Sequence, residues 1–230
     1  MLVFGKNVVI EILNNNKKIH KAYIYKEFSD QNIISELQNK NIRIEYKEKY
    51  QLDKLADKNH QGIIVEIDDF KYSNLEDIIK ENSFIVILDH IEDPHNFGAI
   101  IRTCEAAKVD GIIIPKDRSV SVNSTVMKTS AGALENMKIV EVTNLTNTIK
   151  ELKKKGFWFV ATDMDGTDYK QIDYKGNIAI VIGNEGNGIS RLVKENCDFV
   201  ASIPMAGKVN SLNASVATGI IIFEALSQRK

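Results

Sequence analysis

The stretch FIVILDHIEDPHNFGAIIRT, residues 84–103, decides the fold class. Its first five residues form an unbroken apolar run, which is typical of a strand that is covered on both faces. An acidic loop follows, Pro94 forces a turn, and Asn96 can cap a helix that the apolar spacing predicts over 99–107. A buried strand that leads directly into a helix indicates an α/β domain with a parallel sheet.

The same pattern recurs through the rest of the chain. Continuous apolar runs predict further strands at 111–114, 158–161, 178–182 and 200–203. Helical spacing predicts helices between and after them, at 126–137, 145–152, 189–193 and 214–226. Because strands alternate with helices, we expect a mainly parallel sheet with helices on both sides. The last helix is apolar around most of its circumference, which favours a subunit interface and a deep core position about equally.

Residues 6–67 show a separate, smaller α/β pattern. Helical spacing and short apolar runs predict, in order, a helix at 6–14, a strand at 22–25, a helix at 32–37, a strand at 42–46, a helical turn at 52–55 and a strand at 62–67. The polar stretch that follows is typical of a connector. We therefore predict a small N-terminal domain over 1–68, a linker over 69–82 and a larger domain over 83–230.

Composition excludes several classes of protein. The 230 residues are 43% hydrophobic and 27% charged, which is ordinary for a soluble globular protein. Thirty basic and thirty-one acidic residues give a net charge of -1, so any basic surface must be local. Cys104 and Cys197 lack CxxC spacing, which argues against a disulfide framework and fits a reducing cytosol. We see no signal peptide and no apolar run long enough to cross a bilayer, and we expect a cytoplasmic protein.

Two further segments are candidates for chemistry, since open α/β sheets bind ligands beyond the carboxyl ends of their strands. IVIGNEGNGIS, residues 180–190, places three glycines around Glu185, and glycines permit close backbone approach to a ligand. It matches neither a Walker A loop nor GxGxxG, which disfavours the usual phosphate sites. IPMAGKVNSLNASVATG, residues 203–219, runs through a polar loop into the last helix, which Ser211 or Asn213 can cap.

Each segment also has a purely structural interpretation. Asn96 can be only a helix cap and Arg102 only a surface charge. The glycine-rich loop can be a simple turn, with Glu185 near the positive end of a helix. The acidic loop holds residue types that bind metals, but their spacing matches no zinc signature and we expect no metal there: His90, Asp93 and His95.

Together, the three segments resemble the three ordered motifs of the SpoU (TrmH-type) RNA ribose 2′-O-methyltransferases, which belong to the SPOUT group. The residues that carry the resemblance are Asn96 and Arg102 in DPHNFGAIIRT, Glu185 in IGNEGNG, and Ser211 and Asn213 in NSLNAS. Residues 2–67, which end in HQG at 60–62, resemble that family's substrate-binding extension, itself similar to a ribosomal-protein (L30-like) fold. PKDRS at 115–119 and the stretch 203–219 resemble most the RlmB branch, which methylates a guanosine in 23S ribosomal RNA; Lys208 and Asn210 stand where smaller residues are expected.

The resemblance implies a deep trefoil knot in the C-terminal domain, a homodimer formed through that domain, and S-adenosylmethionine as cofactor. It also implies that Arg102 acts on the attacking ribose hydroxyl. Because arginine stays protonated, we expect its guanidinium to stabilise the developing 2′-oxyanion. Glu185 is expected to pair with Arg102 or to order the motif loops. The residues expected to position the RNA and Arg102 are Asn96, Ser211 and Asn213, and those expected at the cofactor are Gly183, Ile203, Met205 and Leu212.

We expect the substrate to be a guanosine of 23S ribosomal RNA, since the N-terminal extension favours ribosomal over transfer RNA. The alternatives are a transfer RNA methyltransferase of the same family, a catalytically silent RNA-binding protein with this fold, and an enzyme that binds nucleotide phosphates with IGNEGNG. Basic residues gather in three groups that are plausible phosphate contacts. These groups are Lys17, Lys18, His20 and Lys21; Lys47, Lys49, Lys54 and Lys58; and Lys116, Arg118 and Lys128.

Overall fold

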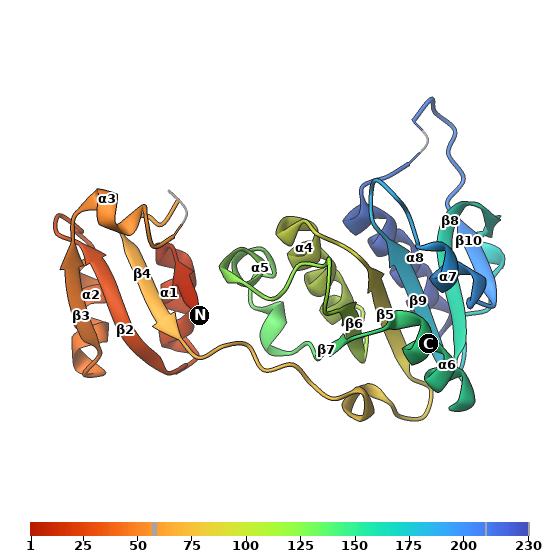
Figure 1. Cartoon of the computed structure of the whole chain (residues 1–230), viewed down its shortest axis with the longest axis horizontal. Coiled ribbons are helices and arrows are strands. Elements are labelled where there is room, and N and C mark those ends of the chain that lie inside the picture. Colours follow the sequence, from red (N-terminus) through yellow and green to blue (C-terminus); the bar gives the residue numbers. More distant parts are fainter. Residues whose placement is uncertain (57–58, 210, 230) are drawn as a thin grey trace. The chain divides into compact units, whose positions relative to one another are not determined.

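The computed structural model describes residues 1–56, 59–209 and 211–229, and it divides into two compact units (Figure 1). Unit 1 comprises Met1–Lys71 with Val122–Lys128, and unit 2 comprises Tyr72–Ser121 with Thr129–Lys230. The predicted basic residue Lys58 and the predicted departure at Asn210 lie outside the described residues. The boundaries 1–68, 69–82 and 83–230 stay a prediction.

Unit 1 is built on a four-stranded sheet with the order β1-β4-β2-β3. β4 pairs antiparallel with β1 and β2, while β2 and β3 run parallel. The strands are β1 (Leu2–Phe4), β2 (Ile19–Tyr25), β3 (Arg43–Lys47) and β4 (Ile63–Ile67), and the helices are α1 (Lys6–Asn14), α2 (Gln31–Asn39) and α3 (Lys49–Leu52). The pattern missed β1, because three residues are too few for a period of two to be recognised, and the helical turn expected at 52–55 is instead α3 at Lys49–Leu52.

The HQG turn of unit 1 joins β4 to the start of α1. His60 is buried, its Nδ1 accepts from the Gly62 N–H at 2.9 Å, and its Nε2 lies 3.0 Å from Asp53 Oδ1. Because Nδ1 accepts a hydrogen bond, the neutral ring donates through Nε2 to Asp53. Gln61 Oε1 accepts from the backbone N–H of Lys6 at 2.8 Å, and Gly62 adopts a φ of 83°, which glycine tolerates best. These contacts give the HQG sequence a structural role in closing the turn.

Unit 2 contains a six-stranded sheet with the order β10-β8-β9-β5-β6-β7, in which every neighbouring pair is parallel. Its strands are β5 (Phe84–Asp89), β6 (Gly111–Pro115), β7 (Ile139–Val142), β8 (Trp158–Asp168), β9 (Ile178–Gly183) and β10 (Phe199–Ser202). The expectation of an α/β fold with a parallel sheet is confirmed. β7 was absent from the predicted strands, because this four-residue edge strand has no long apolar run.

Helices cover both faces of this sheet, as Figure 1 shows. On one face, α6 (Leu145–Lys154) and α7 (Arg191–Glu195) contribute Ile149, Leu152 and Val193 to a cluster with alternate residues of β5, such as Ile85 and Ile87. On the other face, α4 (Pro94–Ala106) packs against α8 (Ala214–Gln228). Every residue of β5 is buried, as the unbroken apolar run predicts for a strand covered on both faces.

One predicted helix is wrong in extent. The helix expected over 126–137 is instead α5 (Ser124–Thr129) followed by a short 3-10 helix, η2 (Ala133–Glu135). Ala131 and Gly132 between them adopt φ values of 49° and 85°, and left-handed backbone interrupts a right-handed helix. Two other 3-10 turns, η1 (Leu75–Ile78) and η3 (Tyr169–Gln171), complete the elements.

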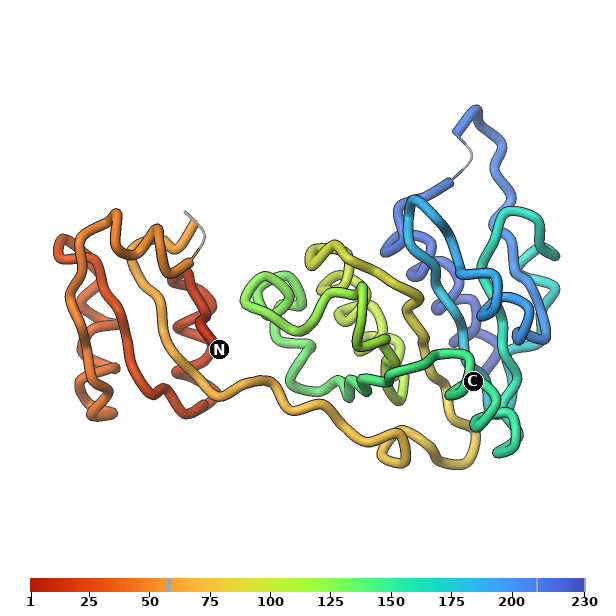
Figure 2. Tube along the Cα trace, viewed as in Figure 1, coloured from red at the N-terminus to blue at the C-terminus, as the bar shows by residue number. Residues whose placement is uncertain are grey.

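The last helix returns to the sheet after β10. Figure 2 traces the chain from β10 outward and back into α8, which contacts β9 as well as α4. The side of α8 that faces unit 2 is buried through Thr218, Ile221 and Ile222, while Val216 and Phe223 are each 49% exposed. The helix thus has both a core face and an open apolar face. The trefoil knot stays a prediction. In the described part of the chain, no helix has the length and apolar character needed to cross a membrane.

Candidate functional site

The three segments predicted to carry chemistry all leave unit 2 at the carboxyl ends of strands. β5 ends at Asp89 before the acidic loop and α4, β9 ends at Gly183 before the glycine-rich loop, and β10 ends at Ser202 before the segment that enters α8. Since the strands are parallel, these ends lie along one edge of the sheet, where α/β proteins bind their ligands.

A hydrogen-bonded cluster joins the three segments. Asn96 Nδ2 donates to Glu185 Oε1 at 2.5 Å, and Asn213 Nδ2 donates to the same oxygen at 2.8 Å and to Asn96 Oδ1 at 2.9 Å. The carboxylate is thus held by two neutral amide groups that lie 89 and 28 residues away in sequence. Glu185 thus accepts bonds from the first and third motif segments, and the role expected for it stays a prediction.

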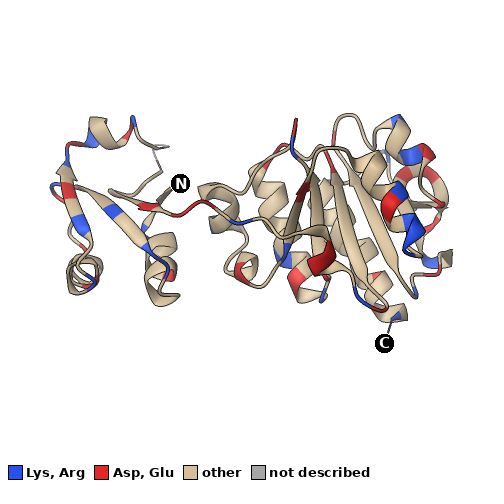
Figure 3. Cartoon of the chain, turned by 60° about the horizontal axis from the view of Figure 1, so that its bottom comes forward, with Lys and Arg blue, Asp and Glu red and all other residues tan. Residues whose placement is uncertain are grey.

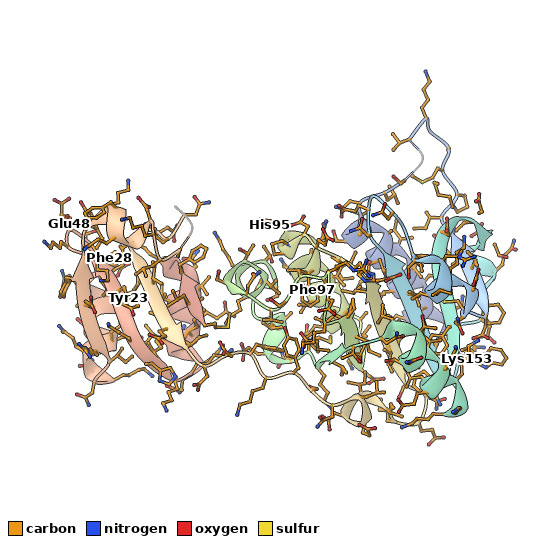
Figure 4. All side chains as sticks on the ribbon, in the orientation of Figure 1. Tyr23, Phe28, Glu48, His95, Phe97 and Lys153 are labelled. Atoms are coloured by element: carbon orange, nitrogen blue, oxygen red, sulfur yellow. The ribbon has the colours of Figure 1, made fainter. Side chains whose placement is uncertain are left out.

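Asn96 and Asn213 occupy different positions relative to their helices. The cap of α4 is Asp93, whose Oδ1 accepts from the His95 N–H, so the prediction of Asn96 as the cap is wrong. Asn96 lies in the first turn and is 8% exposed, between the exposed His95 and the fully buried Phe97 that Figure 4 labels. Asn213 does cap α8, because its Oδ1 accepts from the N–H groups that open the helix, those of Ser215 and Val216.

The glycine-rich loop folds tightly on itself. Asn184 and Gly188 exchange two backbone hydrogen bonds, of 3.1 and 2.8 Å, and Asn184 Nδ2 donates to the His90 carbonyl at 2.8 Å. A Cβ on Gly183 would lie 2.3 Å from the backbone carbon of Gly188. Gly183 is therefore required by the loop's own packing, and the loop in turn presents Glu185.

A cavity of about 420 Å³ lies beside this cluster, within the size range of small-molecule and cofactor sites. Six of the predicted site residues line it: Gly183, Glu185, Ile203, Met205, Ser211 and Leu212. The rest of the wall combines apolar residues of β9 and α8, including Ile182, Ala217 and Ile221, with residues from the end of β8 and from the glycine-rich loop. Residues of the second and third motif segments thus line one pocket, and the first segment is joined to it through the bond from Asn96 to Glu185.

Arg102 occupies a different place. It lies on α4, is exposed, and is not among the described residues that line the cavity. Within the described part of the chain, its side chain has no hydrogen-bond or ion-pair partner. The next residue, Thr103, lies against α8 at Gly219, where an added Cβ would be 3.8 Å from Thr103 Cγ2. Arg102 therefore stands one residue before a contact of α4 with α8 and outside the described wall of the cavity.

One ion pair of the cavity wall was not predicted from the sequence. Asp163 lines the cavity, and its Oδ2 lies 2.6 Å from Lys194 Nζ on α7. The Lys194 ammonium group, through this hydrogen bond, holds the pKa of the Asp163 carboxyl below its ordinary value. A signal was present, since TDMD at 162–165 directly follows the apolar run of β8, at the same sheet edge as the three motifs.

The acidic loop shows no metal centre. Within 1–56, 59–209 and 211–229, no group of three or more His, Cys, Asp or Glu side chains is arranged to hold a metal ion. His90 Nδ1 instead lies 2.5 Å from Asp89 Oδ1, and Asp93 serves as the cap of α4.

Comparison with known proteins agrees with this geometry. Residues 83–223 match the model of the SpoU rRNA methylase family, and residues 2–73 match that of the substrate-binding domain of RNA 2′-O ribose methyltransferases. The chain therefore belongs to the SpoU family of RNA methyltransferases, with an N-terminal substrate-binding unit. The predicted family, fold class and enzyme class are confirmed.

Individual relatives cover the chain almost completely. YacO of Bacillus subtilis, whose description assigns it to the TrmH family of tRNA/rRNA methyltransferases, is 41% identical over 99% of this chain and 95% of its own length. A relative from Staphylococcus aureus with the same family description is 42% identical, over 99% of this chain and 96% of its own length. These descriptions name both kinds of RNA, so the RlmB branch stays a prediction.

Solved structures support the same fold. An AdoMet-bound rRNA methyltransferase from Sinorhizobium meliloti superimposes with a TM-score of 0.76 at 30% identity, covering 97% of this chain and 85% of that chain. AviRb, a SpoU methyltransferase from Streptomyces viridochromogenes in complex with AdoMet, gives a TM-score of 0.78 at 24% identity, over 99% of this chain and 90% of its own.

Proposed function

We propose that this enzyme transfers a methyl group from S-adenosylmethionine to the ribose 2′-oxygen of a guanosine in 23S ribosomal RNA. The observation that carries the proposal is the Asn96–Glu185–Asn213 cluster, which joins the three motif segments beside a cavity of about 420 Å³. Methyl transfer requires a bound donor, an oriented sugar hydroxyl and a group that stabilises the oxygen as it loses its proton.

The cavity suits S-adenosylmethionine in size and in chemistry. Ile203 and Leu212 offer an apolar slot for an adenine ring, and the adjoining loops supply backbone hydrogen-bonding groups. Among the described residues, Glu185 bonds only to neutral amide groups, so its negative charge is available to a cationic ligand. When bound, the cofactor supplies an activated methyl group on a positively charged sulfur. We assign Gly183, Ile203, Met205 and Leu212 to its binding, Gly183 through the loop that it allows to close.

We assign the stabilisation of the developing 2′-oxyanion to Arg102. A guanidinium remains protonated at all ordinary pH values, so it donates hydrogen bonds to the oxygen rather than removing its proton. Its exposed position on α4, without a protein partner among the described residues, leaves its donors free for RNA. Asn96, Ser211 and Asn213 are assigned to orienting the ribose and its phosphate, and Glu185 to fixing Asn96 and Asn213.

The open face of α8 favours a homodimer. Val216 and Phe223 are each 49% exposed on this helix, and half-exposed large apolar side chains on one face are typical of a partner surface. α8 packs on α4, which carries Arg102. Because α8 packs on α4, a partner subunit bound to this face affects which groups the Arg102 guanidinium can contact.

Recognition of RNA is assigned in part to unit 1. On its sheet, Lys21 and Lys47 lie 4.6 and 5.5 Å from the ring centre of Tyr23, labelled in Figure 4, and both pair with Glu45. The two ammonium groups lower the pKa of Glu45 to about 2. Figure 3 shows basic and acidic segments interspersed along both units, in keeping with the net charge of -1. The match to a substrate-binding family model supports RNA as the ligand of unit 1.

The test is methyl transfer from labelled S-adenosylmethionine to 23S ribosomal RNA and to total transfer RNA, followed by mapping of 2′-O-methyl positions. We expect one modified guanosine in 23S RNA, in the cytoplasmic pool of ribosomal RNA. Arg102→Ala should lower turnover by about 100-fold or more, the cost of removing one oxyanion donor, while cofactor affinity is retained. Arg102→Lys, which keeps the charge but loses the planar guanidinium, is the matched control. Its turnover should lie between that of wild type and that of Arg102→Ala.

The alternatives give different results. Modification of transfer RNA alone would refute ribosomal RNA as the substrate, but it would agree with methyl transfer to a ribose 2′-oxygen. Cofactor binding without transfer to either RNA would favour the catalytically silent RNA-binding protein. Binding of ATP in place of S-adenosylmethionine, measured by titration with both ligands, would favour the nucleotide-binding enzyme. Wild-type turnover by Arg102→Ala would contradict the role assigned to Arg102.

A further inference from the structure

A second cavity, of about 480 Å³, lies at the carboxyl ends of β5, β6 and β7. Its walls come from His90 after β5, from Pro115, Asp117 and Arg118 at the end of β6, from residues 143–146 after β7, and from residues 190–193 around the start of α7. No described residue lines both this cavity and the cofactor cavity. The loop after β9 nevertheless serves both, since residues 183–188 line the cofactor cavity and residues 190–193 line the second one.

Two guanidinium groups dominate the charge of this second cavity. Arg118 is exposed and has no hydrogen-bond or ion-pair partner in the part of the chain that the structure describes. Among the described residues, Arg191 pairs only with Glu195, at 3.6 Å across one turn of α7, with the two side chains 83% and 55% exposed. Ion pairs this exposed contribute at most about 1 kcal/mol to stability. Arg191 can therefore exchange its contact with Glu195 for one with a ligand at little cost.

The acidic groups of the cavity do not cancel this charge. Asp89, next to His90, is 1% exposed and is already satisfied, because Oδ2 accepts from the Ser190 N–H at 2.6 Å and Oδ1 lies 2.5 Å from His90 Nδ1. Asp117 lines the wall and is the one lining carboxylate among the described residues. Glu195 faces Arg191 only through an exposed ion pair and Asp117 is the remaining carboxylate, so the Arg118 guanidinium, which has no partner among the described residues, favours an anionic ligand.

The uncharged part of the wall is also suited to an anion. The hydroxyl groups of Thr146 and Ser190 and the side-chain amide of Asn144 are hydrogen-bond donors. Ser190 precedes α7 without using its side chain to cap the helix, so its hydroxyl is not consumed there. The cofactor cavity, by contrast, is walled largely by aliphatic side chains. Two guanidinium forks with neutral donors match the oxygens of a phosphodiester.

Arg118 adopts a backbone conformation that glycine or asparagine would take more readily. Its φ is 52°, in the left-handed region, and His90 on another wall of the cavity has a φ of 59°. A charged side chain at such a position carries a conformational cost of about 1 kcal/mol. Asparagine tolerates this conformation, so Arg118→Asn removes the guanidinium without adding backbone strain.

We propose that the second cavity binds a backbone phosphate of the RNA strand that carries the target nucleotide, with Arg118 and Arg191 as its ligands. The proposal rests on the RNA methyltransferase activity. Because both cavities share the loop after β9, a strand whose ribose lies at the cofactor cavity passes beside the second one. A phosphate fixed there sets the register of the strand and thereby the position of the reacting sugar.

The experiment measures binding of a 23S RNA fragment to the full-length protein as a function of salt, without methyl transfer. Arg118→Asn and Arg191→Gln should each weaken binding about tenfold and reduce the slope of log affinity against log salt by nearly one unit. Lys154→Gln, which removes an exposed charge from the other end of α6, is the control and should change neither value appreciably. Cofactor affinity, measured by calorimetry, should be unchanged in all three variants and shows that unit 2 is folded.

A scan of the RNA with single neutral methylphosphonate linkages sharpens the test. One linkage beside the target nucleotide should weaken binding to the wild-type protein and have no effect on the double variant of Arg118→Asn and Arg191→Gln. Unchanged RNA affinity and salt slope in that double variant would overturn the proposal, whether or not the enzyme proves to methylate 23S RNA. Binding of inorganic phosphate by the wild-type protein without any loss of RNA affinity in the variants would identify a free-anion site and would also overturn it.

Discussion

Replacing Gly183 with alanine tests the idea that the glycine-rich loop is held closed by its own backbone. The added Cβ would lie 2.3 Å from the carbon and 2.6 Å from the oxygen of Gly188, and 2.4 Å from the nitrogen of Ile189. All three are backbone atoms, which cannot rotate away as a side chain can. Carbon atoms in contact prefer about 3.5–4.0 Å, so the loop must move by more than an ångström.

The cost follows from what holds the loop. Moving Gly188 breaks its two backbone hydrogen bonds with Asn184, each worth about 0.5–1.5 kcal/mol. The steric term of inserting a carbon into a packed site adds about 1–3 kcal/mol. We therefore expect Gly183→Ala to lower the free energy of unfolding of unit 2 by about 2–6 kcal/mol, and its melting temperature by roughly 5–20 °C. Because Glu185 moves with the loop, affinity for S-adenosylmethionine should fall at least about tenfold.

Gly186→Ala, in the same loop, is the matched control. Its nearest neighbour is Asn184 Oδ1 at 3.4 Å, an ordinary contact, and its φ is not positive. We expect a change within about 0.5 kcal/mol. Differential scanning calorimetry and isothermal titration with the cofactor measure both variants. If Gly183→Ala melts and binds like Gly186→Ala, the loop yields without cost and the argument for its closed form fails.

Two other predictions concern stability. Arg229 donates to the carbonyls of Tyr174, Gly176 and Asn82, so Arg229→Ala should lower the free energy of unfolding by about 1–3 kcal/mol, and Arg229→Lys by less than that, in thermal melts. The pKa of Asp163 is lowered by Lys194, so the pair contributes stability above the unfolded pKa of about 3.9, and this is lost as pH falls through the lower folded value. Asp163→Asn should therefore melt below wild type at pH 5–8, with the difference shrinking as the pH falls below about 3.9; a constant difference at all pH values would contradict this.

The sequence predicted the architecture of unit 2 because its strands carry unbroken apolar runs. It failed where a local signal was weak or ambiguous. Asp93 and Asn96 are both capping residue types, and the apolar spacing alone placed the helix start at 99, whereas Pro94 at the first helical position makes Asp93 the cap. The predicted helix over 126–137 ignored the break at Ala131 and Gly132, where the backbone turns left-handed.

The site was only partly accessible from sequence. The residue types of the Asn96–Glu185–Asn213 cluster could be identified, but their convergence depends on β9 lying next to β5, a pairing between strands that are far apart in the chain. Gly183 was expected near the cofactor because of the family resemblance. The structure adds the specific reason, which is the close approach of Gly188. Arg118 was expected among the phosphate contacts, but its place beside Arg191 in one cavity could not be predicted, because only the sheet edge brings the two segments together.

The two cavities also explain how a chain with a net charge of -1 can act on RNA. A large uniform positive field is unnecessary if a few guanidinium groups face the strand at fixed positions, because each neutralised phosphate releases its own counterions. The loop of residues 183–193 forms a wall of both cavities, one largely aliphatic and one cationic. A displacement of this loop, as in Gly183→Ala, should therefore weaken RNA binding along with cofactor binding, whereas loss of Arg118 should weaken RNA binding alone. This difference between the two variants distinguishes two cavities that share a wall from two cavities that act independently.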